Sequence, residues 1–232
     1  MSYSFTSILF LIAVAFTMYA QSTVNSNFRR YSNVRNQRGI TGAQAARAVL
    51  DANGLGDVQI EQIRGSLTDH YDPRKRVLRL SQTVYGVASV AAVSVACHEA
   101  GHAVQYAQHY APIKLRAAII PITNIGSRLA MPLILLGVLA STLGNFSTIL
   151  IDLGILAFSL SLVFQLITLP VEFNASRRAL QAIRSSDLLT EDELQGAKRT
   201  LSAAAMTYVA ATAVAFAQLL RLILLFGRRR RD

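Results

Sequence analysis

The residues with the clearest chemical potential are His98, Glu99 and His102, which stand in the order His-Glu-x-x-His. Side chains four positions apart on an α-helix lie nearly above one another, so the two imidazoles would point at one place with Glu99 beside them. Zinc enzymes use this arrangement when a bound water must lose a proton to a neighbouring carboxylate. The spacing therefore predicts a Zn²⁺ site with His98 and His102 as ligands and Glu99 as the general base.

A chance match to this short pattern is the alternative interpretation. The surrounding residues are mostly Ala and Val, so an unpaired carboxylate and two imidazoles would be costly to bury there. That cost favours metal binding, although a structural salt bridge stays open for Glu99. Cys97 adjoins His98 but points to another side of the helix, where we expect it to pack in the core.

A catalytic zinc usually has three protein ligands and one open position for water. Glu172 follows the predicted turn at Gly144 by about 28 residues, or roughly 42 Å of helix, which is close to the thickness of a bilayer with its headgroups. It would therefore emerge on the same side as His98, whereas Asp152 would lie near the opposite face. We expect Glu172 to be the third ligand, with an ion pair to a neighbouring arginine as the alternative.

The elements that must position these residues can be read from composition and periodicity. The chain of 232 residues is 52% hydrophobic and only 16% charged, with a formal net charge of +10. Soluble domains are about a quarter charged, so apolar segments that cross a bilayer explain the difference. Such segments are expected at 5–20, 119–143, 146–169 and 201–226.

The residues between the first two apolar segments predict a small mixed domain. A capping box at Thr41 and Gln44 begins a helix over 41–54. Alternating patterns predict strands at 58–63, 66–70 and 77–80, followed by the His-Glu-x-x-His helix over 84–108. The expected fold class is a mainly α-helical membrane protein, in which a helical bundle carries a small α+β zincin-like domain.

The predicted boundaries divide the chain into five parts. They are an N-terminal membrane anchor at 1–22, the zincin-like domain at 23–117, a transmembrane hairpin at 118–170, a third-ligand segment with a polar loop at 171–200, and a C-terminal membrane helix with a basic tail at 201–232.

The motifs resemble a known family. His98 to His102, followed far downstream by Glu172-Phe173-Asn174-Ala175-Ser176, resembles the gluzincin pattern. More narrowly, essentially the whole chain resembles the neutral zinc metallopeptidases of the YugP type in bacterial membranes. The Glu-x-x-Ala segment is also similar to that of the membrane-anchored HtpX peptidases. There, and in thermolysin-like enzymes, an Asp four residues after the ligand Glu orients a zinc histidine; this chain has Ser176 at that place, as a candidate hydrogen-bond partner.

A peptidase also needs a donor for the tetrahedral oxyanion besides the metal. Side chains that could serve lie on the predicted hairpin and after the zinc helix: His70, Tyr71, Tyr106, His109 and Tyr110. The alternative is that they bond only within their own turns. Arg128 stands alone in an apolar segment, so it could bind a substrate carboxylate or extend its guanidinium to the membrane surface.

The basic residues lie beside the apolar segments, as expected for loops that contact lipid headgroups. They do not interleave with aromatic residues, which argues against a nucleic-acid partner. Most lie on the side of the predicted domain and favour a cytoplasmic active site in a bacterial cell membrane, whereas the basic tail at 228–231 argues for the opposite orientation. A membrane-protein partner or a homo-oligomer is compatible with this organisation.

Together these features predict a membrane-embedded zinc endopeptidase that acts on membrane or unfolded proteins. The alternative is a non-catalytic membrane scaffold or partner-binding protein that zinc stabilises. A structural zinc is normally closed by four protein ligands, whereas three convincing ligands are found here, which favours catalysis.

Overall fold

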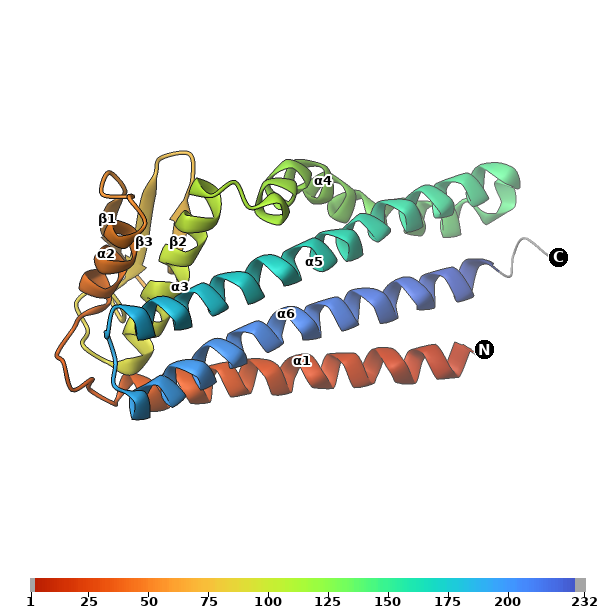
Figure 1. The fold of residues 1–232 in the computed structure, drawn as a ribbon. Helices are drawn as coiled ribbons and strands as arrows, with labels where there is room; N and C mark the ends of the chain where they lie inside the picture. The colour runs from red at the N-terminus through yellow and green to blue at the C-terminus, as the bar shows by residue number, and fades with distance from the viewer. Residues whose placement is uncertain (1–2, 228–232) are drawn as a thin grey trace. The chain divides into compact units, whose positions relative to one another are not determined.

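The computed structural model describes residues 3–227, so the basic tail at 228–231 lies outside the described residues. Its helices and strands, in chain order, are α1 (Tyr3–Ser32), α2 (Gly42–Ala52), β1 (Gln59–Ile63), β2 (His70–Asp72), β3 (Val77–Ser81), α3 (Val90–Ala107), α4 (Ala111–Leu139), the short 3-10 helix η1 (Ser141–Leu143), α5 (Asn145–Ser185) and α6 (Glu191–Phe226) (Figure 1). The predicted class, a mainly helical membrane protein with a small α+β region, is confirmed.

The described chain forms two compact units. The helical unit holds residues 3–19, 114–169 and 208–227, and the sheet unit holds 20–113 and 170–207. Long helices contribute to both units, because α1, α4, α5 and α6 each contain a boundary.

The helical unit is built from segments suited to a bilayer. The helices long and apolar enough to cross a membrane are Phe5–Ser32, Ala111–Leu139, Asn145–Ser185 and Glu191–Phe226. Leu135, Leu139 and Leu156 are more than half exposed, as expected for side chains whose solvent is lipid.

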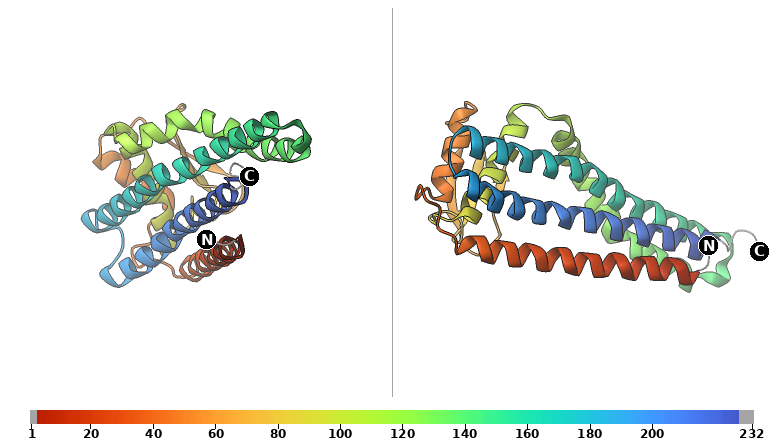
Figure 2. Two further views of the ribbon diagram at one scale, coloured as in Figure 1. Left: turned by 90° about the vertical axis from the view of Figure 1, so that its right-hand side faces the viewer. Right: turned by 60° about the horizontal axis from the view of Figure 1, so that its bottom comes forward.

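Small residues allow α4 and α5 to approach closely inside the helical unit, where the two helices lie side by side (Figure 2). A Cβ atom on Gly137 would meet the carbonyl oxygen of Ser147 at 2.9 Å, and one on Gly154 would meet that of Ala130 at 2.8 Å. The Ser147 hydroxyl also donates to the Gly137 carbonyl at 2.6 Å. Such contacts hold membrane helices together where lipid removes the hydrophobic driving force.

The sheet has the strand order β1-β3-β2, with β1 parallel and β2 antiparallel to β3. Arg79 on the central strand ties the three together, because its guanidinium lies 3.1 Å from Glu61 on β1 and 3.0 Å from Asp72 on β2. The hydrogen bond from Arg79 lowers the pKa of Asp72 below its usual range.

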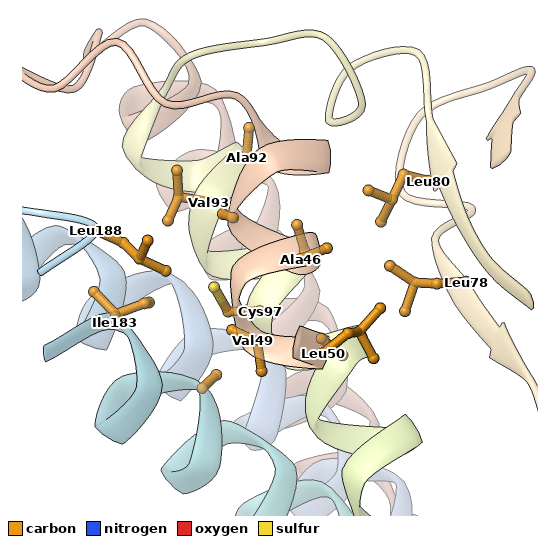
Figure 3. Packing of buried hydrophobic residues seen from close by; sticks show 14 of the residues in the cluster. Ala46, Val49, Leu50, Leu78, Leu80, Ala92, Val93, Cys97, Ile183 and Leu188 are labelled. Carbon is orange, nitrogen blue, oxygen red and sulfur yellow. The ribbon is translucent and has the colours of Figure 1, made fainter. Parts of the chain in front are cut away.

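The core of the sheet unit joins the sheet to the helix that carries the predicted zinc ligands (Figure 3). Its fully or nearly fully buried side chains include Val49 and Leu50 of α2, Leu78 and Leu80 of β3, Val93 and Cys97 of α3, and Ile183 of α5. Burial raises the pKa of the Cys97 thiol, which packs in this core as predicted.

Two predicted elements are wrong at their boundaries. The second strand does not cover 66–70 but begins at His70, because Leu67 adopts a positive φ of 56°, which lies outside the β region. The His-Glu-x-x-His helix does not begin at residue 84. Ser89 is its N-cap, with a side chain that accepts a hydrogen bond from the Ala92 amide at 3.1 Å.

Candidate metal centre

Helix α3 brings the His-Glu-x-x-His residues against the part of α5 that follows Pro170. The α5 helix continues through Pro170 as far as Ser185, so Glu172 lies on a helix within the sheet unit. Gly101 is the residue that allows the two helices to meet, since a Cβ there would lie 3.0 Å from the Ala175 carbonyl oxygen. The glycine between the two histidines is therefore a packing requirement.

Glu172 comes close to both histidines. Its Oε2 lies 3.3 Å from Nε2 of His98 and 3.6 Å from Nε2 of His102, and the two rings stand edge to face with centroids 4.8 Å apart. The carboxylate is buried, with 2% of Glu172 exposed. The structure thus brings together the three residues that the sequence predicts as ligands.

The spacing of these atoms fits a zinc ion. Ligand atoms about 2.0–2.1 Å from a tetrahedral zinc lie roughly 3.3–3.4 Å from one another. The two measured separations, 3.3 and 3.6 Å, are close to that value, and the donor set of two imidazoles and a carboxylate is one that zinc favours. The residues present therefore fit the metal.

Glu99 lies beside these groups, because one potential ligand atom from each of His98, Glu99 and His102 falls within 4.8 Å of the others. Burial raises the pKa of the Glu99 carboxyl above its ordinary value, against the opposite influence of His102 and His98. Glu172 lies 3.3 and 3.6 Å from the two imidazoles, within the 4.8 Å limit of the group that contains Glu99. Glu172 is therefore better placed to share a metal with the imidazoles, and Glu99 is better placed to face a molecule bound to that metal.

The far side of each imidazole has a neutral partner. The Ser176 hydroxyl lies 3.2 Å from Nδ1 of His98, and Oε1 of Gln105 lies 2.9 Å from Nδ1 of His102. The structure therefore brings Ser176, which the sequence offered as a candidate, to His98, a predicted zinc ligand. Sequence reasoning missed Gln105, although its position three residues after His102 places it on the same helix face.

The predicted oxyanion donors divide between the sheet and the end of α3. Nδ1 of His70 donates to the Thr68 carbonyl at 2.9 Å, and the rings of Tyr71 and Tyr106 pack 5.8 Å apart. His109 is exposed just after α3, with a φ of 55°. The oxyanion role of these residues stays a prediction.

Two further candidates lie outside this cluster. The Tyr110 hydroxyl donates to the Pro170 carbonyl at 3.4 Å, so it contacts the α5 backbone just before Glu172. Arg128 belongs to the helical unit, where it is exposed on α4.

Comparison with known proteins identifies the family of this chain. Residues 6–227 match the model of a family described as "putative neutral zinc metallopeptidase". The chain belongs to this family. It is also 50% identical, over 218 residues, to "Putative membrane protease YugP" of Bacillus subtilis (strain 168), an alignment that covers 94% of this chain and 95% of that protein.

No solved structure matches the chain. Membership confirms the resemblance drawn from the motifs and makes zinc the metal of this family. His98, Glu99 and His102 form a cluster in this chain that could hold a metal ion.

Proposed function

We propose that this protein is a membrane-anchored zinc endopeptidase in which His98, His102 and Glu172 hold the metal and Glu99 is the general base. The observation that supports it best is the approach of one Glu172 oxygen to the Nε2 atoms of both histidines, at 3.3 and 3.6 Å. Two segments far apart in the sequence meet there in the geometry that zinc needs.

Zinc, when bound, would lower the pKa of a bound water to about 7 and polarise the substrate carbonyl. Glu99 would accept a proton from the attacking water as its oxygen bonds to the carbonyl carbon. Glu99 would then give that proton to the amide nitrogen as the C–N bond breaks. Electrons and protons balance without a covalent bond to the enzyme.

The position of Glu172 on a long apolar helix supports a membrane or unfolded protein as the substrate. Glu172 follows the apolar residues 146–169 on the same continuous helix, α5, which is long and apolar enough to cross a membrane, so the proposed ligand is close in sequence to the apolar part of that helix. We propose a site that works near the bilayer surface, and the basic residues beside it favour the cytoplasmic side. The domain boundaries predicted from the sequence stay a prediction.

A non-catalytic scaffold is the competing function, and one experiment separates the two. Wild type, Glu99→Gln and His98→Ala would be purified in detergent and tested for zinc content and casein cleavage, with the exposed Glu191→Gln as control. We expect wild type and the control to bind zinc and cleave. Glu99→Gln should bind zinc but lose about 10²–10⁴-fold in rate, and His98→Ala should lose both. A wild type that holds zinc without cleaving, or a fully active Glu99→Gln, would favour the scaffold.

A further inference from the structure

We propose that Gln105, held by Asn174 and Arg178, selects the tautomer of His102 that leaves Nε2 free for zinc. Gln105 and its two neighbours are then positioning residues for the proposed function, on which this inference rests. The tautomer follows from which of these groups can donate a hydrogen bond and which can accept one.

The chain of hydrogen bonds begins at Arg178. A guanidinium has only donors, so its Nε must donate to the atom of Asn174 that faces it at 2.7 Å, and that atom must be the Oδ1 oxygen. The NH1 group of the same guanidinium donates to Oε1 of Gln108 at 2.7 Å, which helps to hold Arg178 in place.

The next step fixes the amide of Gln105. Its Nε2 lies 2.8 Å from the Val171 carbonyl and 2.9 Å from Oδ1 of Asn174. Both oxygens are acceptors in this arrangement, so the NH₂ group of Gln105 must face them and its Oε1 must face the other way. The orientation of this amide therefore follows from its neighbours.

The last step reaches the metal centre. Oε1 of Gln105 lies 2.9 Å from Nδ1 of His102 and can only accept, so Nδ1 must carry the hydrogen. In the neutral imidazole the lone pair then belongs to Nε2, the atom that faces Glu172 at 3.6 Å. A histidine that binds zinc through Nε2 needs this tautomer.

Burial strengthens the effect of this chain of hydrogen bonds from Arg178 to His102, called the relay below, on the tautomer of His102. Gln105 is completely buried and Asn174 is 8% exposed, so water has little access to replace a lost hydrogen bond. His98 differs, because the Ser176 hydroxyl beside its Nδ1 can donate or accept and so does not choose a tautomer. The relay therefore acts on His102 specifically, and the atom that faces Nδ1 is the oxygen of a neutral amide.

The test compares Gln105→Met, which removes the acceptor, with Gln105→Glu, which keeps one. Nitrogen-15 NMR of the zinc-free protein reports the tautomer of each of its four histidines. Wild type and Gln105→Glu should show His102 with hydrogen on Nδ1, and Gln105→Met should lose this preference. Competition with a zinc chelator should show about 10–100-fold weaker zinc binding by Gln105→Met, a size expected for loss of an outer partner of a ligand, and tighter binding by Gln105→Glu than by Gln105→Met.

A second pair of variants avoids substitution in the core. Arg178→Ala should shift the His102 tautomer and weaken zinc binding less than Gln105→Met does. The adjacent and exposed Arg177→Ala, which removes the same charge, should change neither. This pair keeps the proposal testable if Gln105→Met fails to fold.

Two outcomes would overturn the relay: an unchanged His102 tautomer in folded Gln105→Met, or equal effects of Arg178→Ala and Arg177→Ala. Either result would leave the proposed peptidase intact as long as wild type binds zinc through His98 and cleaves protein. Failure of wild type to bind zinc there would instead refute the proposed function itself.

Discussion

Substitution of Gly101 by alanine tests whether the contact between α3 and α5 positions the third ligand. The new Cβ would lie 3.0 Å from the Ala175 carbonyl oxygen, whereas ordinary van der Waals contact begins at 3.4 Å. The two helices must therefore separate by about 0.4 Å at this point. Glu172 precedes Ala175 by three residues on the same helix, so its carboxylate moves with that backbone.

The Gly101→Ala substitution should change the free energy of folding little and the zinc affinity strongly. Alanine is favoured over glycine inside a helix by about 1 kcal/mol, whereas overpacking costs about 1–3 kcal/mol, so the net loss of folding free energy is roughly 0–2 kcal/mol. Zinc coordination is less tolerant, because ligand distances must hold within about 0.2 Å. We expect Gly101→Ala to fold and to bind zinc about 10–100-fold more weakly, the range seen when support for a ligand is lost.

The assay is chelator competition for zinc together with thermal unfolding in detergent. The matched control is Gly126→Ala in the helical unit, where a new Cβ would approach the Ala157 carbonyl oxygen at a similar 3.1 Å. The control should lose stability but keep its zinc affinity. Folded Gly101→Ala with wild-type zinc affinity would refute the claim that this helix contact positions Glu172.

Three further predictions concern the metal, pH and orientation. Chelation should lower the free energy of unfolding by about 4 kcal/mol if free zinc had been at a thousand times its Kd, and added zinc should restore the melting temperature; an unchanged melting temperature would count against a shared site on α3 and α5. Asp72 has a lowered pKa, so its contribution to stability is present above the usual aspartate range and fades as the pH falls through the folded-state value. The difference in free energy of unfolding between wild type and Asp72→Asn should therefore shrink as the pH is lowered below about 5. A difference that does not change with pH would contradict the bond to Arg79. Arg74→Cys, exposed in the turn between β2 and β3, should react with a membrane-impermeant maleimide only after bacterial cells are opened, with buried Cys97 giving little background; labelling of intact cells would place the domain outside.

The sequence predicted which residues of the candidate site lie together, because spacing on a helix is a local property. His98, Glu99 and His102 follow from a spacing of four residues within one helix. Glu172 required a long-range argument, and the length of a helix that crosses a bilayer supplied it. Composition and the length of the apolar segments predicted the mainly helical membrane class, since few soluble domains have so few charged residues and segments of that length cross a bilayer as helices.

The parts that the sequence did not predict depend on tertiary contacts or on backbone angles. Gln105 lies on the same helix face as His102, but the bonds that orient its amide come from residues of α5 far along the chain, which the local spacing does not reveal. The positive φ of Leu67 shortened the second strand, and an Asn or Gly there would have been an easier signal to read. The cap at Ser89 was obscured by a preceding apolar turn that resembles helix in composition.

The central claim is that Glu172 completes a zinc site begun by two histidines on another helix. The most direct measurement is the zinc affinity of purified Glu172→Gln beside wild type, by chelator competition and metal analysis. We expect wild type to hold about one zinc ion per chain and Glu172→Gln to lose it under conditions where the exposed Glu191→Gln keeps it. Zinc bound by folded Glu172→Gln with wild-type affinity would contradict the account.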